Sequence, residues 1–218
     1  ALVRRLEGGP LALELAAARL GSLGVAGVLA RLDGPGGPTL GGLVRGDGRS
    51  GSLEATLAWS WDLLDPAAQR ALCALAVFGG GFRASDAEAV LGGGQAGALD
   101  VLVDHSLVET RHREEGVSLR LYRTVRSFAV ARREGVLGAA QGAAVSRAHA
   151  AWAARFGALG RMWSAQTAEA RALLLRLPRH RADVHAAWCW AREAGEGRLE
   201  TELAVALGFL HLRFGPYE

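Results

Sequence analysis

A change in hydrophobic spacing within residues 119–129 constrains the fold of this chain more than any other feature. Leu119 and Leu121 alternate with polar residues, which is the two-residue period of a strand. From Val125 through Phe128 the apolar residues follow the 3.6-residue period of a helix. The spacing therefore predicts a strand that runs directly into an amphipathic helix.

Composition favours a helical protein with a sizeable core. Alanine and leucine are abundant, and both promote helix. The 218 residues suffice for one large or two small domains, and half of them are hydrophobic. Cys73 and Cys189 lie in helical patterns and are predicted to be small buried side chains rather than a disulfide, which fits a reducing cytoplasm.

No targeting or membrane segment is visible. Charged residues interrupt every apolar run well before the roughly 20 residues that a transmembrane helix needs, so we expect no membrane contact. No signal peptide is recognisable, and the chain opens inside a predicted helix. We therefore expect a fragment of a longer, cytoplasmic protein.

The chain divides into four segments. Residues 1–33 are helical, and residues 34–52 form a linker rich in glycine. In residues 53–138, helices precede two strands, a pattern typical of a winged helix. Residues 139–218 read as paired helices, typical of an α-solenoid of tetratricopeptide (TPR-like) type. The predicted fold is mainly α, with a winged-helix domain carrying one small β-hairpin.

Local signals set the expected bounds of the middle segment. Asp65 and Pro66 are predicted to cap a helix that reaches about Phe78. Ser85 is predicted to cap the next helix, with Glu88 completing a capping box.

Further helix and strand patterns follow in the same segment. A third helical pattern covers residues 96–105. Residues 107–111 and 117–122 are predicted strands joined by a polar turn.

The charge pattern gives limited information about partners. The net charge is +3, and all 25 basic residues are arginine. This set fits a coding bias, and it also fits a phosphate-binding surface, because arginine binds phosphate bidentately. The helix at 96–105 would be the recognition helix of a winged helix, yet it carries Asp100 and Asp104, which repel DNA phosphate. Protein contact is therefore favoured over DNA reading there.

No arrangement of residues indicates a self-contained enzyme. A phosphate-binding loop of the Gly-x-x-x-x-Gly-Lys type needs a lysine, and the chain has none. His180 and His185 are five positions apart, which is a poor spacing for one metal ion, so the histidines are interpreted as exposed polar side chains. No metal site is expected, and no Ser/His/Asp or Cys/His arrangement has supporting context.

Several segments together resemble one known family, the bacterial STAND (NB-ARC-like) signalling ATPases. That family includes large transcriptional regulators of the AfsR and LuxR/MalT types. The similar segments follow the family's order and span nearly the whole chain: residues 5–20, 53–66, 75–82, 102–108, 119–129 and 184–190.

The resemblance implies a role in a nucleotide switch. Residues 1–33 would end the ATPase core, and ADP or ATP would be bound by the parent protein rather than by this fragment alone. The family's Gly-x-Pro motif, which packs beside the adenine, is matched by Gly8, Gly9 and Pro10. The family's phosphate-sensing histidine is replaced by Tyr122, which is followed by Arg123; these two residues either contact nucleotide or serve as packing and solvated charge.

The resemblance also implies partners. The chain would contact its own ATPase core, and the helical segment would receive a protein or small-molecule inducer. Two rival functions remain open. One is a DNA-binding winged helix that uses arginines around the hairpin: Arg111, Arg113, Arg120, Arg123 and Arg126. The other is a helical-repeat scaffold, formed by residues 139–218, that binds protein.

Overall fold

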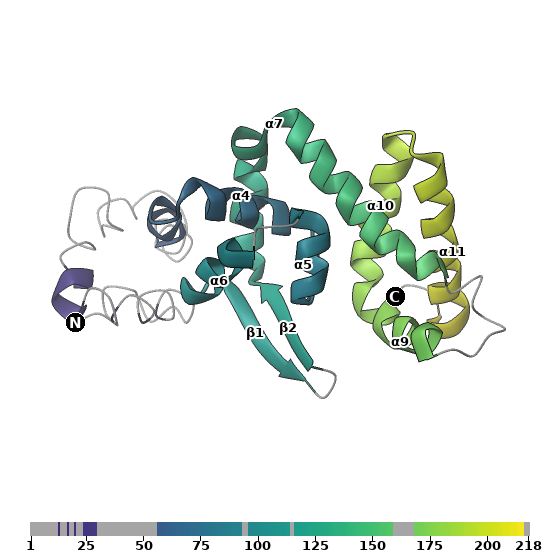
Figure 1. Ribbon diagram of the computed structural model, residues 1–218, viewed down its shortest axis with the longest axis horizontal. Coiled ribbons are helices and arrows are strands. Elements are labelled where there is room, and N and C mark those ends of the chain that lie inside the picture. The colour runs from purple at the N-terminus through teal and green to yellow at the C-terminus, as the bar shows by residue number, and fades with distance from the viewer. Residues whose placement is uncertain are drawn as a thin grey trace.

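The computed structural model describes residues 24–29, 56–92, 96–113, 116–158 and 168–215, with the single positions Leu13, Ala17 and Leu20. The predicted linker and the expected nucleotide residues Gly8, Gly9 and Pro10 lie outside these ranges. The described chain is mainly α with one small antiparallel hairpin, as predicted. In Figure 1 the hairpin projects away from the helices that carry it, and α10 and α11 stand at the far side.

We call residues 56–137 the hairpin unit. It holds a helix at residues 56–62 and the first part of the long helix α7. Its other elements, in chain order, are α4 (Pro66–Leu75), α5 (Ala84–Leu91), α6 (Ala96–Asp104), β1 (Val108–Arg113) and β2 (Gly116–Leu121).

We call residues 139–215 the helical unit. Helix α7 (Arg123–Ala154) passes from one unit into the other and bends sharply at Gly138, whose φ is 68°. This bend adjoins the domain boundary expected after residue 138, although that boundary remains a prediction. The remaining elements are η2 (Arg155–Gly157), α9 (Ala168–Arg176), η3 (Leu177–His180), α10 (Arg181–Glu193) and α11 (Gly197–Phe214).

The start of α4 confirms the predicted cap. Asp65 is the N-cap residue, and its Oδ1 accepts a 2.7 Å hydrogen bond from the Ala68 N–H. Pro66 occupies the first helical turn, where its missing N–H costs nothing. The helix ends at Leu75, slightly earlier than expected.

The predicted cap of α5 is wrong. The helix begins at Ala84 rather than after Ser85, and Arg83 is the N-cap residue. The chain is already extended at Phe82, which forms an antiparallel bridge with Leu119, so the helix can begin as soon as this bridge ends. Asp86 is consequently the third helical residue, and its carboxylate accepts from the Arg83 N–H at 2.9 Å.

The hairpin confirms the strand-to-helix junction. β2 ends at Leu121 and α7 begins at Arg123, with Tyr122 as the N-cap residue. The register pairs Val108 with Leu121 and Arg111 with Ser118. Each strand lies within about two residues of its predicted bounds, which is normal for strand ends.

A single core unites the two units. α7 contacts α4 and α5 of the hairpin unit and α10 and α11 of the helical unit. The largest fully buried side chains of this core include Phe78 and Phe82 from the hairpin unit, and Phe156 and Leu203 from the helical unit. Burying side chains of this size contributes about 1.5–3 kcal/mol each, so the contact between the units is substantial.

Three further predictions can be compared with the fold. Cys73 is buried, as predicted, whereas Cys189 is half-buried, and both are free thiols. Within the described residues, no helix is long and apolar enough to span a bilayer. α10 and α11 pack side by side through the short connection at Gly195, whose φ is 70°.

Candidate functional site

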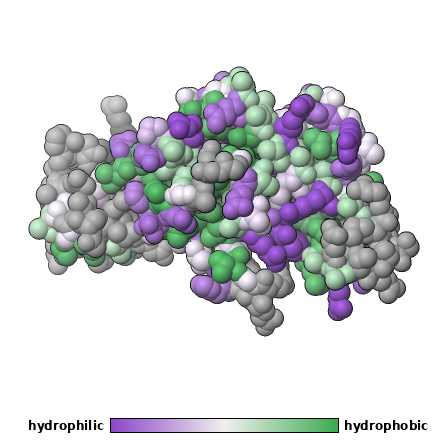
Figure 2. Space-filling view, viewed as in Figure 1, coloured by the Kyte–Doolittle hydropathy of each residue, from purple (hydrophilic) through white to green (hydrophobic). Residues whose placement is uncertain are grey.

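The contact between the hairpin unit and the helical unit is unusually polar. Figure 2 shows hydrophilic side chains gathered where the two units meet. Two carboxylates, Asp86 and Asp183, are fully buried there, one from each unit. Buried carboxylates need charge or hydrogen-bond partners, so their surroundings determine what this interface does.

Asp86 belongs to the hairpin unit and binds side chains of the helical unit. Its Oδ1 accepts from Trp152 Nε1 at 2.9 Å and from the Arg155 guanidinium at 2.7 Å. Its Oδ2 accepts from the Arg176 guanidinium at 2.6 Å. With the Arg83 N–H included, one carboxylate joins α5, α7 and α9.

Asp183 belongs to the helical unit and binds the hairpin unit. Its Oδ1 accepts a 2.6 Å hydrogen bond from the backbone N–H of Gly79, in the loop after α4. His180 Nδ1 lies 3.1 Å from Oδ2 on the same carboxylate. His149 Nε2 lies 3.7 Å from Oδ1, which is an ion-pair distance rather than a hydrogen bond. The two carboxylates therefore reach across the interface in opposite directions.

Aromatic rings fill the space between the carboxylates. Phe78 of the hairpin unit meets Trp152 edge to face, with ring centroids 5.0 Å apart, and His149 at 5.2 Å. Trp152 also meets His180 at 5.0 Å. His149 and His180 are both 4% exposed, so the interpretation of the histidines as exposed polar side chains is wrong for these two.

Both carboxylates remain ionised inside the interface. Burial alone would raise the pKa of Asp183, but its contacts with His149, His180 and the Gly79 N–H outweigh burial and lower this pKa to about 2. Burial opposes ionisation of Asp86 as well, and the bonds from Trp152, the Arg83 N–H and Arg155 lower its pKa. Each carboxylate thus stabilises the folded state as an anion.

A pocket of about 340 Å³ opens beside this network, between the hairpin and η3. Five arginines line it, as do Ser118, His180 and the loop at Gly80 and Gly81. A Cβ at Gly81 would lie 2.8 Å from Ser118 Oγ, so a larger residue there would displace the Ser118 hydroxyl. The arginines come from both units: Arg83, Arg111, Arg120, Arg176 and Arg179.

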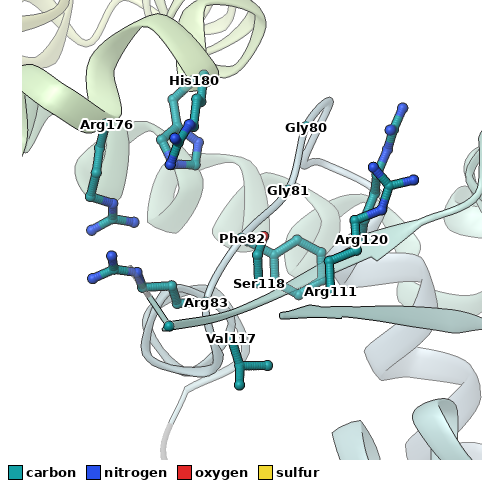
Figure 3. Close-up of a pocket in the computed structure, with 12 residues that line it drawn as sticks. Gly80, Gly81, Phe82, Arg83, Arg111, Val117, Ser118, Arg120, Arg176 and His180 are labelled. Atoms are coloured by element: carbon teal, nitrogen blue, oxygen red, sulfur yellow. The ribbon is translucent and has the colours of Figure 1, made fainter. Parts of the chain in front are cut away.

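Figure 3 shows how these arginines are arranged. Arg83 and Arg176 point their guanidinium groups toward one another, while Arg111 and Arg120 come from the hairpin on the other side. Burial lowers the pKa of Arg176, and the positive charges of Arg155 and Arg83 lower it further, against the opposite effect of Asp86. The pocket is therefore a concentration of positive charge.

The residues predicted to contact nucleotide are only partly placed. Tyr122 is half-buried and lines a second cavity of about 400 Å³ together with Ala17, Ser106, Glu109 and Thr110. Arg123 is exposed and does not line that cavity. The structure thus places Tyr122 and Ala17 in the lining of one cavity, while the places of Gly8, Gly9 and Pro10 stay predictions.

Arg126, one of the arginines that would contact DNA if the hairpin unit bound it, makes hydrogen bonds within the protein. Its Nε donates to the carbonyl oxygens of Ala76 and Phe78, at 3.0 and 2.9 Å, just beyond the end of α4. Both carbonyls lie where the chain has left the helix, so no backbone N–H of α4 can pair with them. Through its Nε, Arg126 therefore fastens the start of α7 to the chain just after α4.

Sequence reasoning missed the two carboxylates. Asp86 reads as an ordinary acidic residue in a first helical turn, and its partners lie 66 to 90 positions away. One local signal for Asp183 was present, since His180 precedes it by three positions, the spacing of neighbours on a helix face. Within the described ranges, no group of three or more potential metal ligands occurs.

Comparisons with known proteins find relatives that are much longer than this chain. No family model matches it, and no solved structure matches it significantly. A protein of Mycobacterium bovis named "Putative HTH-type transcriptional regulator" is 31% identical over 225 residues, which cover 98% of this chain and 25% of the relative. A relative of the same description from Mycobacterium tuberculosis has the same identity and coverage.

A second kind of relative covers less of the chain. An uncharacterised protein of Mycobacterium bovis is 34% identical over 136 residues, which are 59% of this chain and 35% of the relative. The longer matches leave little of the chain unaligned, whereas the chain spans about a quarter of the length of those relatives. Over almost its whole length, the chain is thus similar to part of proteins named as HTH-type transcriptional regulators.

Proposed function

We propose that this chain is the coupling segment of a nucleotide-switched transcription regulator. In this role the chain reads no DNA and hydrolyses no nucleotide. It transmits the nucleotide state of an upstream ATPase core to the helical unit, which would receive an inducer. Its relatives support the regulatory part of the proposal, since they are named as HTH-type transcriptional regulators.

The observation that carries the proposal is the pair of buried carboxylates. Asp86 binds Arg155 and Arg176 of the helical unit, and Asp183 binds the Gly79 N–H of the hairpin unit. Removing one partner of a buried ion pair typically costs about 3–5 kcal/mol, so separating the units would expose or strand several charges at once. The two units would therefore move together, and a displacement of one would carry the other with it.

The cavity at Tyr122 supports a nucleotide contact on the N-terminal side. It lies between the hairpin unit and the segment that carries Ala17, and Tyr122, Ser106 and Thr110 bring hydroxyl groups to its lining. Hydroxyls suit hydrogen bonds to a sugar or a base. Glu109 also lines this cavity and would repel phosphate. Phosphate binding would then fall to the upstream core, which also would supply the lysine of a phosphate loop.

DNA reading by the hairpin unit is not part of the proposal. Helix α6, in the position of a recognition helix, exposes Asp100 and Asp104. Two carboxylates on that face oppose approach to the phosphate backbone. DNA recognition would belong to another part of the longer regulator.

ADP titration of the chain joined to its upstream core tests the proposal. We expect the extended protein to bind ADP and the 218-residue chain alone to bind it weakly. Tyr122→Phe and Pro10→Ala should weaken binding about two- to tenfold, the usual effect of losing one hydrogen bond or packing contact. Arg123→Gln tests the charge role expected of Arg123, and Arg70→Gln, an exposed change on α4, is the control. Unchanged affinity in both the Tyr122 and Pro10 variants would refute the nucleotide contact.

A further inference from the structure

The arginine-lined pocket between the hairpin and η3 has no role in the function proposed above. It shares no lining residue with the cavity at Tyr122. Its volume of about 340 Å³ falls in the range of small-molecule sites, which is about 300–1,000 Å³. A concave, strongly charged site of this size needs a separate explanation.

Five arginines line the pocket, and carboxylates of the described residues pair with some of them. Of its five arginines, Arg176 is paired with Asp86, and Arg111 is paired with Glu109 at 3.0 Å. Arg120 forms no ion pair with the part of the chain that the structure describes. Guanidinium groups that lie close together repel one another, and a bound anion would relieve that repulsion.

The placement of these arginines carries the argument, since every basic residue in this chain is arginine and the residue type alone is uninformative. Arg83 and Arg176 face one another across the inner part of the pocket, whereas Arg111 and Arg120 stand on the hairpin. Two separate groups of guanidiniums suit a ligand with at least two anionic groups. Each guanidinium can bind a phosphate through two parallel hydrogen bonds.

We infer that this pocket binds a small molecule carrying two or more phosphate groups. The ligand would rest between the hairpin and η3 and would contact both units at once. Ser118 offers a hydroxyl to the same space, and the Gly80–Gly81 backbone leaves room beside it. Since both units contribute arginines, binding would tighten the same interface that Asp86 and Asp183 hold.

Duplex DNA fits the pocket less well than a small ligand. A duplex lies along an extended surface, and the innermost arginines are partly covered: the Arg176 side chain is only 14% exposed. Proteins that read DNA place a helix or a strand ribbon into a groove. Here the hairpin face that bears Arg111 and Arg120 is turned toward the helical unit.

Calorimetric titration of the 218-residue chain with inorganic pyrophosphate at low ionic strength tests the inference. The test variant combines Arg120→Gln with Arg179→Gln, one exposed arginine from each wall. The matched control combines Arg70→Gln with Arg213→Gln, which removes the same charge from exposed positions outside the pocket. Circular dichroism verifies that both variants remain folded.

We expect one pyrophosphate per chain, bound at least about tenfold more weakly by the test variant, because two charge-assisted hydrogen-bonding groups are lost. The control variant should stay within about twofold of the parent chain. Absence of binding would overturn the inference, as would an equal loss in both variants, which indicates diffuse attraction. If a DNA duplex bound through the same two arginines and pyrophosphate did not bind, the inference would be overturned, and the pocket would be a DNA contact instead of a small-molecule site.

The outcome is separable from the proposed function. Pyrophosphate binding is measured on this chain alone, whereas ADP binding at Tyr122 is measured with the upstream core. Arg120→Gln and Arg179→Gln should leave that ADP affinity unchanged, since neither residue lines the cavity at Tyr122.

Discussion

Asp183 accepts a 2.6 Å hydrogen bond from the backbone N–H of Gly79, a residue 104 positions earlier in the chain. Asp183 lies in the first turn of α10, and Gly79 lies in the loop after α4. Asp86 makes the reverse connection by holding Arg155 and Arg176. With a bond in each direction, we expect the two units to move as a single body.

Replacing Asp86 tests how strongly the hairpin unit and the helical unit are held together. Asp86→Asn leaves the shape of the side chain but removes the charge that faces Arg155 and Arg176. Because Asp86 is fully buried, we expect a loss of about 3 kcal/mol in the free energy of unfolding, measured by urea denaturation. Glu88→Gln, an exposed change on the same helix, should stay within about 0.5 kcal/mol. A similar small loss in Asp86→Asn would show that the ion pairs add little.

The lowered pKa of Asp183 predicts that the free energy of unfolding falls at acid pH. Its pKa is about 2 in the folded chain, below the value near 4 expected when unfolded. A lowered folded pKa adds stability above the unfolded value, and this stability is lost as the pH falls toward 2. The stability gap between the parent chain and Asp183→Asn should therefore shrink between about pH 5 and pH 2. Glu193→Gln, exposed on the same helix, supplies the control; a gap constant with pH would contradict the pKa assignment.

Replacement by alanine should have opposite effects on stability at Gly157 and at Gly208. A Cβ at Gly157 would lie 2.3 Å from the Glu202 carbonyl oxygen, so η2 and α11 would have to separate. Gly157→Ala should destabilise by about 1–3 kcal/mol in thermal or urea unfolding. Gly208→Ala, within α11 and with nothing near its Cβ position, should stabilise by up to about 1 kcal/mol. Equal effects of the two substitutions would rule out the close approach.

The two thiols should differ sharply in reactivity. Cys73 is fully buried, its Sγ donates to the Ala129 carbonyl at 3.6 Å, and burial raises its pKa to about 11. Cys189 is half-buried on α10. At pH 8 a thiol reagent should modify one cysteine in the native chain and the second only after unfolding. Rapid modification of both would mean that α4 and α7 open readily.

The local parts of the fold could be predicted because their causes lie close together in the sequence. Asp65 and Pro66 specify the start of α4, and the alternation at Leu119 and Leu121 specifies β2. The start of α5 was misplaced because a distant contact, the bridge between Phe82 and Leu119, determines it.

The candidate site could not be predicted for a similar reason. Asp86, Trp152 and Arg176 meet only after α7 bends at Gly138 and brings the helical unit back beside α5. The arginine pocket likewise needs residues from both units. The sequence indicated Tyr122 as either a nucleotide contact or a packing residue, and that choice stays a prediction, although Tyr122 lines a cavity together with Ala17.

The most direct measurement of the central claim is a distance distribution across the interface. Spin labels at Ala89→Cys on α5 and Ala186→Cys on α10, both exposed positions, report the two units in a Cys189→Ser background. Cys73 is expected to stay unlabelled because it is buried. Pulsed electron paramagnetic resonance should give one narrow distance, which broadens when Asp86→Asn and Asp183→Asn are combined. A broad or two-peaked distribution in the unmutated interface would show that the units move independently and would contradict the account.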